Sequence, residues 1–171
     1  GAVAGARAAA AEIDLTQHKG EHPRMGAADV IPFIPLGTAT MADAVRAAEQ
    51  AAERIAREAG VPTFLYGEAA RAPERRDLAW VRKGEFEGLK ELVPTDPARV
   101  PDFGPRRLHA TAGASAVGAR FFLIAFNVNL ATQDLAVAKK IAKEIREKDG
   151  GLPGVKALGF ALEALGQVQV S

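Results

Sequence analysis

Residues 40–59 carry the clearest periodic pattern in the chain, and this pattern predicts a long amphipathic helix. Thr40 is a typical N-cap, Asp43 stands at the capping-box spacing, and Gly60 with Pro62 ends the helix. The apolar positions recur with a helical period, at Met41, Val45, Ala48, Ala52, Ile55 and Ala59. A helix with one apolar stripe must bury that stripe against another element, so the chain is expected to fold in packed layers.

The remaining predicted elements are a mixture of helices and strands. Helices are predicted at 1–13, 73–82 and 132–148, with a further turn or two at 85–92. Strands are predicted at 29–34, 62–66, 120–130, 155–162 and 167–170, and a proline-rich loop at 93–105. Pro32 removes a hydrogen-bond donor from the first strand, which indicates an edge, a bulge or a stretch that faces a ligand. This order predicts an α+β fold, an α/β sandwich in which sheets carry helices on one face.

Composition excludes several classes of function. Lys and Arg number 22 against 21 Asp and Glu, and a net charge of +1 gives no basic surface for nucleic acid. The chain has no cysteine, so disulfides, thiolate catalysis and Cys-ligated zinc are absent. The longest apolar run, Phe121–Phe126, is too short to span a membrane. We therefore expect a soluble cytoplasmic protein that binds neither nucleic acid nor membrane.

Two of the three histidines lie four residues apart, at His18 and His22, in a loop that also contains Lys19 and Arg24. The run is formally H-x-x-E-H, a pattern of one class of zinc peptidases that requires a helix. Gly20 between the histidines and the proline after the second argue against a helix, so we expect no metal here. A histidine in a loop can instead exchange a proton near neutral pH, and Lys19 and Arg24 could bind carboxylates. A polar surface loop with solvated charges is the alternative.

Two further segments have the composition of ligand-binding elements. The run from Gly104 to Gly113 has glycine at both ends and contains Arg106, Arg107 and His109, which suits an anionic or planar ligand. An exposed basic connector is the alternative. Asn127 and Asn129 are two residues apart on a predicted strand, so their side chains face the same side. Such an amide pair either lines a pocket or makes hydrogen bonds at the end of the strand.

Six motifs are distributed along the chain. The first is the run from His18 to Pro35, HKGEHPRMGAADVIPFIP. The others are LYGEAAR at 65–71, RKGEFE at 82–87, DFGP at 102–105, GAR at 118–120 and FLIAFNVNL at 122–130. In this order they closely resemble the formimidoyltransferase domain, which occurs alone in glutamate formimidoyltransferases and fused to a cyclodeaminase in the animal bifunctional enzyme.

The resemblance implies two α/β subdomains with folate held between them, here residues 1–119 and 120–171. It implies that both subdomains are incomplete, because the chain begins inside the first and stops before the end of the second. It implies that His22 is the catalytic histidine and that tetrahydrofolate is the co-substrate. It assigns folate binding to the segment Gly104, Pro105, Arg106, Arg107, Leu108, His109, Ala110, Thr111, Ala112 and Gly113, where residues 106–109 depart from the animal pattern.

The implied reaction moves a formimidoyl group from N-formimidoyl-L-glutamate to tetrahydrofolate, giving 5-formimidoyltetrahydrofolate and glutamate in histidine degradation and one-carbon metabolism. Lys19, Arg24, Asn127 and Asn129 are weaker candidates for substrate binding. A homodimer is compatible with the resemblance. The alternatives are an inactive folate-binding relative, an H-x-x-E-H zinc hydrolase, and a formyl in place of a formimidoyl donor.

Overall fold

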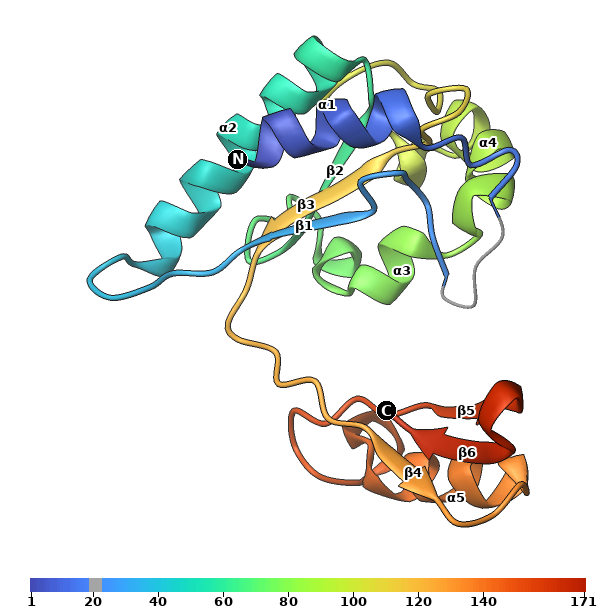
Figure 1. Cartoon of the computed structure of the whole chain (residues 1–171). Coiled ribbons are helices and arrows are strands. Elements are labelled where there is room, and N and C mark those ends of the chain that lie inside the picture. Colours follow the sequence, from blue (N-terminus) through green and yellow to red (C-terminus); the bar gives the residue numbers. More distant parts are fainter. Residues whose placement is uncertain (19–22) are drawn as a thin grey trace. The chain divides into compact units, whose positions relative to one another are not determined.

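The computed structural model describes residues 1–18 and 23–171, and the chain divides into two compact units. Unit 1 comprises Gly1–Phe122 and unit 2 comprises Leu123–Ser171. Each unit contains helices and a three-stranded sheet, so the predicted α+β class is confirmed (Figure 1). The subdomain boundary expected between residues 119 and 120 stays a prediction. Within the described ranges, no helix combines the length and the hydropathy needed to cross a bilayer.

The sheet of unit 1 is parallel, in the order β1–β3–β2. Its strands are β1 (Val30–Phe33), β2 (Thr63–Gly67) and β3 (Ser115–Ala119). Among the described residues, β1 pairs with β3 alone, so Pro32 lies on an edge strand. An edge was one of the positions predicted for a proline that lacks a backbone donor.

The central strand β3 was not predicted from the sequence. Its residues, SAVGA, are small, and only Val117 is a typical strand former. The structure explains their size, because all five are buried between two neighbouring strands. A Cβ on Gly118 would lie 2.3 Å from the carbonyl oxygen of Tyr66. Close packing in the tertiary structure, rather than intrinsic strand preference, therefore places β3 at the centre.

Helices cover both faces of the unit 1 sheet (Figure 1). On one face α1 (Ala2–Glu12) and α2 (Met41–Ala59) pack in a core with Leu65 and Val117. On the other, α3 (Leu78–Arg82) and α4 (Glu85–Thr95) pack in a core with Phe64 and Ala116. The prediction that helices cover one face of each sheet is therefore wrong for unit 1. Neighbouring residues of β2 and β3 point to opposite faces of the sheet, and because both faces are apolar, both are covered by helices.

The long helix α2 forms as its sequence predicts. Thr40 and Asp43 make a reciprocal capping box, and Gly60 ends the helix in the left-handed conformation at φ 68°. The following region contains more helix than expected. The predicted helix 73–82 is a 3₁₀ turn, Pro73–Arg76, followed by α3, and α4 continues to Thr95 with Pro94 in its last turn. Another 3₁₀ turn, Pro97–Arg99, follows.

Unit 2 is an antiparallel sheet in the order β4–β6–β5 with one helix against it. Its strands are β4 (Val128–Leu130), β5 (Gly159–Leu162) and β6 (Gln167–Val170), and its helix is α5 (Leu135–Ile145). Short 3₁₀ turns occur at Glu147–Asp149 and Glu163–Leu165. Val168 and Val170 pack against Ala138 and Ala142 of α5, so here the helix lies on one face, as predicted.

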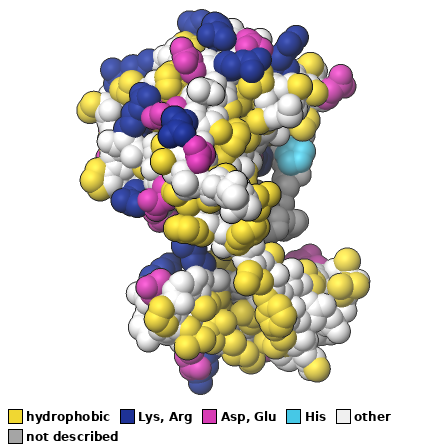
Figure 2. Space-filling view, turned by 90° about the vertical axis from the view of Figure 1, so that its left-hand side faces the viewer, with side chains coloured by type: hydrophobic (Ala, Val, Ile, Leu, Met, Phe, Trp, Pro, Cys, Tyr) yellow, Lys and Arg dark blue, Asp and Glu magenta, His cyan; other side chains and the backbone are white. Residues whose placement is uncertain are grey.

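The strand prediction for residues 120–130 is wrong for residues 120–127. Only Val128–Leu130 form a strand, and the residues before it have no regular structure. An apolar run forms a strand only where the backbone of another strand pairs with it. β4 pairs with β6 over Val128–Leu130 only. The run is consequently exposed, for example by 87% at Ile124 and 76% at Phe126. Figure 2 shows hydrophobic side chains gathered on the visible face of unit 2.

Candidate functional site

The predicted catalytic residue His22 and the predicted substrate contact Lys19 lie outside the described residues. Their immediate neighbours are described, on one side up to His18 and on the other from Pro23. The candidate site is therefore built from these flanks and from the segment 104–113.

Backbone hydrogen bonds bring the two predicted site segments together at the N-terminal ends of β1 and β3. Ala27 donates to the carbonyl of Ala112 at 3.0 Å, and Ala114 donates to the carbonyl of Met25 at 3.0 Å. On the N-terminal side of the loop, Leu15 donates to the carbonyl of Thr111 at 2.9 Å. Residues separated by more than eighty positions in the sequence thus form one short ladder, centred on a bridge between positions 26 and 113.

Two glycines allow this ladder to close. A Cβ on Gly26 would lie 1.8 Å from the carbonyl oxygen of Ala114. A Cβ on Gly113 would lie 2.1 Å from the carbonyl oxygen of Met25, and Gly113 has φ +68°, a conformation that favours glycine. Any side chain at either position would push the two segments apart.

The side chain of Arg24 joins the loop to α4. Its guanidinium donates two hydrogen bonds to the Glu87 carboxylate, at 2.9 and 2.8 Å, and one to the His18 carbonyl at 3.0 Å. Glu85 lies 3.7 Å away. The Arg24 side chain is only 15% exposed. The fork therefore connects both flanks of the loop to one helix.

The electrostatics of this contact favour the charged forms of both partners. The hydrogen bonds from Arg24 lower the pKa of Glu87 from 4.5 to about 2, and the Glu87 carboxylate raises the pKa of Arg24. With its guanidinium bonded in this way, Arg24 has a structural role in this conformation. Its predicted contact with a substrate carboxylate stays a prediction.

A second arginine supports the approach to β1. Arg82 contacts the Asp29 carboxylate at 2.7 Å and also donates to the Pro23 carbonyl. The other oxygen of Asp29 accepts from the backbone amides of Met25 at 2.7 Å and Gly26 at 3.2 Å. The bend from Pro23 to Asp29 is consequently held by charge-assisted hydrogen bonds on both sides. Neither Arg82 nor Asp29 was identified from local patterns as a site residue, because nothing in a sequence places α3 beside this loop.

His109 shapes the segment 104–113 from within. Its Nδ1 accepts from the backbone amide of Ala112 at 3.0 Å, and its own backbone exchanges two hydrogen bonds with Gly113, at 2.9 and 3.1 Å. An accepting Nδ1 leaves the proton of the neutral ring on Nε2. The ring therefore closes a tight turn within the segment.

The other residues of this segment differ in exposure between its first half and its end. Gly104, Pro105, Arg106 and Arg107 are exposed, and Arg106 donates from Nε to the carbonyl of Val93 at 3.2 Å. In the second half Leu108 and Thr111 are half-buried and Ala110 is exposed, whereas Ala112 and Gly113 at its end are buried. The first half presents two exposed cations, and the buried end, Ala112 and Gly113, anchors the segment beside the sheet.

The two asparagines predicted to bind substrate lie in unit 2, where Asn127 precedes β4 and Asn129 lies within it. Both are exposed. The Asn129 side-chain oxygen accepts a hydrogen bond from Gln169 at 2.7 Å across the sheet. This is the strand-bonding role that was the alternative to a pocket.

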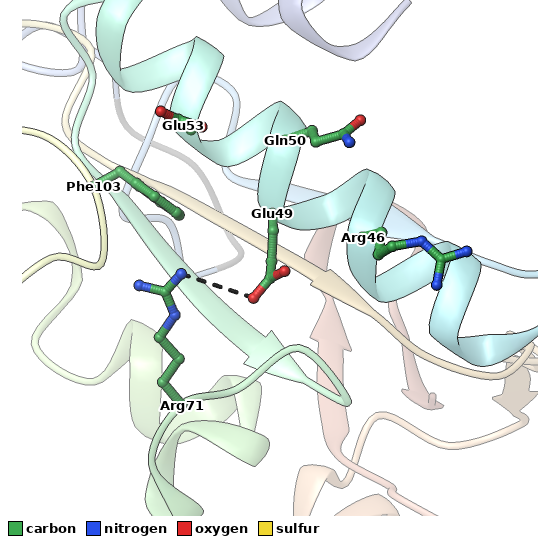
Figure 3. A pocket seen from close by; sticks show the side chains of 6 residues that line it. All are labelled: Arg46, Glu49, Gln50, Glu53, Arg71 and Phe103. Carbon is green, nitrogen blue, oxygen red and sulfur yellow. Dashed lines mark ion pairs between the residues drawn. The ribbon is translucent and has the colours of Figure 1, made fainter.

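A surface pocket of about 430 Å³ lies beside α2, away from the ladder (Figure 3). Arg71 extends from the loop after β2 into it, 3.7 Å from Glu49 and stacked over the Phe103 ring at 4.8 Å. The remaining lining residues are Arg46, Gln50 and Glu53 of α2. Of its charged groups, Arg71 pairs with Glu49, and Arg46 pairs with Asp43, which lies outside the lining. No predicted site residue lines it. Elsewhere in the described residues, no group of three His, Asp or Glu side chains is arranged to hold a metal ion.

Comparison with known proteins gives concordant matches. The family model described as "Formiminotransferase domain, N-terminal subdomain" matches residues 1–120. Over 164 residues the chain is 53% identical to a protein of Streptococcus pyogenes serotype M1 named "Glutamate formimidoyltransferase", covering 95% of this chain and 54% of that protein.

A Thermoplasma acidophilum protein of the same name is 51% identical, over 99% of this chain and 56% of its own length. The Mus musculus "Formimidoyltransferase-cyclodeaminase" is 46% identical over the whole chain and 32% of its own length. The chain thus spans about half the length of the two microbial relatives.

Proposed function

The chain belongs to the formiminotransferase domain family, through its N-terminal subdomain, and from this premise we propose that it takes part in transfer of a formimidoyl group to tetrahydrofolate. The donor is N-formimidoyl-L-glutamate, and the products are 5-formimidoyltetrahydrofolate and glutamate, a step of histidine degradation that feeds one-carbon metabolism. The names of the relatives support this reaction class.

The observation that carries the proposal is the hydrogen-bonded ladder between positions 25–27 and 112–114. It joins the loop that contains the proposed catalytic histidine to the proposed folate segment. An acid/base group and the substrate it serves must lie within hydrogen-bond reach, directly or through one water. The ladder supports the proposal because it brings the flank of the histidine loop, residues 25–27, beside the proposed folate segment.

The proposed chemistry needs one proton removed and one supplied. N5 of tetrahydrofolate attacks the formimidoyl carbon, and a tetrahedral intermediate forms. N5 then loses a proton, and the departing glutamate nitrogen gains one as the carbon–nitrogen bond to glutamate breaks. We assign both transfers to His22, as base and then as acid. Lys19 and, with a rearrangement, Arg24 are proposed contacts for substrate carboxylates, and Asn127 and Asn129 for polar substrate groups.

The cations of the segment 104–113 suit a folate. Arg106 and Arg107 are exposed, and guanidinium groups bind carboxylates such as those of a folate glutamate tail. A cytoplasmic location is part of the proposal, since a chain without cysteine needs no oxidising compartment. Homodimer formation stays a prediction.

The test is formimidoyl transfer from N-formimidoyl-glutamate to tetrahydrofolate by the purified chain, with and without a metal chelator. We expect chelator-insensitive turnover that falls by ~10²–10⁴-fold in His22→Ala, with folate affinity changed little. His18→Ala is the matched control and should retain turnover, because its ring has no proposed role in the proton transfers.

Three outcomes would change the assignment. Full turnover by His22→Ala would remove His22 from the mechanism. Loss of activity and of bound zinc in both histidine variants would favour the zinc-hydrolase alternative. Folate binding by a folded chain without turnover would favour the inactive folate-binding alternative.

A further inference from the structure

One ring nitrogen holds the turn at the buried end of the proposed folate segment. His109 Nδ1 accepts a hydrogen bond from the backbone amide of Ala112 at 3.0 Å, and the amide of Thr111 lies 3.4 Å from the same atom. An amide N–H can only donate, so Nδ1 must present its lone pair to both. Ala112 is 1% exposed, and its amide would be costly to leave without an acceptor. The turn therefore requires a neutral His109 ring that carries its proton on Nε2.

This turn connects the exposed arginines of the segment to the ladder. His109 and Gly113 exchange backbone hydrogen bonds at 2.9 and 3.1 Å, and Gly113 also forms the bridge to Gly26. Arg106 and Arg107, the proposed carboxylate contacts, directly precede the turn in the chain. Opening of the turn would therefore change where these two cations stand relative to the sheet.

We propose that His109 is a positioning residue whose neutral ring closes the folate segment and whose protonation opens it. A proton on Nδ1 would set two donors, Nδ1–H and the Ala112 amide, against each other at 3.0 Å, so the hydrogen bond would be lost. The Thr111 hydroxyl, 3.5 Å from Nδ1, lies beyond the usual N–H···O range and is a poor acceptor for the new proton.

The direction of the pH effect follows from this geometry. Histidine is the side chain that ordinarily changes charge between about pH 5 and 8. The turn is therefore complete above this range and opens as the pH falls through it. The inference concerns unit 1 alone. It rests on the proposed folate role of the segment and adds that folate binding there depends on pH.

Other charged groups lie on the elements that contact this segment. The loop after α1, the bend before β1 and the last turns of α4 carry Asp14, Arg24, Asp29, Lys90 and Glu91. The segment itself adds Arg106 and Arg107. Carboxylates ordinarily lose their charge below about pH 5, and Lys and Arg above about pH 10. In residues 1–18 and 23–171, none of these groups forms an ion pair with His109. His18, on the loop after α1, is the other described histidine there, so it needs a control of its own.

The first measurement is hydrogen exchange at the Ala112 and Gly113 amides, expressed as protection relative to an unstructured peptide at the same pH. A free imidazole is about nine-tenths protonated at pH 5.5, so we expect this protection to fall about tenfold between pH 7.5 and pH 5.5. In His109→Asn the side-chain oxygen takes the place of Nδ1, accepts the same hydrogen bond and cannot be protonated. Its protection should not depend on pH. In His109→Ala protection should be low at both pH values.

The second measurement is the dissociation constant of tetrahydrofolate, kept free of oxygen, at the same two pH values. If only the closed segment binds, the apparent affinity of the wild type falls with the neutral fraction of His109, about tenfold from pH 7.5 to pH 5.5. His109→Asn should keep its affinity. His18→Asn is the matched control and should respond to pH as the wild type does. Titration of the ligand itself occurs with every protein and cancels in the comparison.

Unchanged protection of the α2 amides at both pH values shows that unit 1 stays folded. Under that condition, wild-type protection at Ala112 that stays constant down to pH 5.5 overturns the proposal. A pH-dependent turn with a dissociation constant that does not follow it also overturns the proposal, because the turn then does not position the folate contacts. Absence of tetrahydrofolate binding by every protein at pH 7.5 is a separate result. Together with the expected exchange, it supports the proton-sensitive turn and contradicts the proposed function.

Discussion

At the residue scale, Arg24 is the side chain on which the shape of the candidate loop depends most. It is the one group among those described here that contacts both the His18 carbonyl and the Glu87 carboxylate, so it relates the loop to α4. The pair is half-open to solvent, with Glu87 64% exposed, so we expect it to contribute little to global stability. Its effect should be on geometry and therefore on turnover.

Glu87→Gln tests this role. The amide keeps the size of the side chain but loses the charge that holds the guanidinium fork, and we expect kcat for formimidoyl transfer to fall about tenfold through lost positioning. The free energy of unfolding should change by less than ~1 kcal/mol. Glu85→Gln is the matched control, because Glu85 is farther from Arg24 and should give a smaller effect. Equal kcat in all three proteins would exclude a positioning role for the pair.

The same pair sets a pH dependence of stability. Folding lowers the pKa of Glu87 from 4.5 to about 2, so the folded state binds its proton less readily than the unfolded state. The stabilisation is therefore complete above pH 4.5 and is lost as the pH falls toward 2. Urea unfolding of the wild type and Glu87→Gln should differ at pH 6 by up to ~1 kcal/mol and converge near pH 2. A difference that grows as the pH falls would contradict the assigned direction.

At the scale of elements, the candidate site depends on the close approach of two loops before β1 and β3. Their backbones meet at Gly26 and Gly113, where no side chain fits. Parallel strands leave the N-terminal ends of β1 and β3 side by side, and the ladder extends that pairing into the loops.

Gly26→Ala should separate these loops. A Cβ there would overlap the Ala114 carbonyl oxygen, and we expect a loss of about 2–3 kcal/mol in the free energy of unfolding together with weaker folate binding. Gly88→Ala is the matched control, because a Cβ at this helical position meets nothing within 4 Å. It should stabilise the chain by about 0.5–1 kcal/mol and leave folate affinity unchanged. Chemical denaturation and folate titration measure both. Similar results for the two variants would mean that the loops can move apart freely.

At the scale of the whole molecule, the chain consists of units of unequal size. Unit 1 contains two of the core clusters, one on each face of its sheet, whereas the unit 2 cluster contains five buried residues. Unit 1 includes the first 122 residues, and unit 2 the remaining 49. A domain of about 60 residues is already marginal on its own, because it buries a smaller fraction of its surface than a larger domain does.

We therefore expect the fragment 1–122 to fold without unit 2. Its thermal unfolding, followed by circular dichroism, should be cooperative, and its amide spectrum should be well dispersed. The fragment 123–171 should show a weak or absent transition, because its core cluster contains five buried residues. A fragment 1–122 without a cooperative transition would show that the first unit depends on the second.

The sequence by itself determined the elements whose signals are local. Three such signals are confirmed: the capping box at Thr40, the helical period of the apolar residues in α2, and the end of that helix at Gly60. Each depends on residues within a few positions of one another. The family was also predicted from the sequence, because long motifs such as HKGEHPRMG identify it directly.

Tertiary structure decided the elements that need a distant partner. Residues 120–127 are more apolar than β3, yet Ser115–Ala119 form the central strand because β1 and β2 flank them. Arg24 was predicted to bind substrate, but its bonds to Glu87 depend on where α4 packs. A local pattern reports what a segment prefers, whereas hydrogen-bond and ion-pair partners are chosen when remote segments meet. For this reason the sequence predicted which segments belong to the candidate site, and the fold alone joined positions 26 and 113.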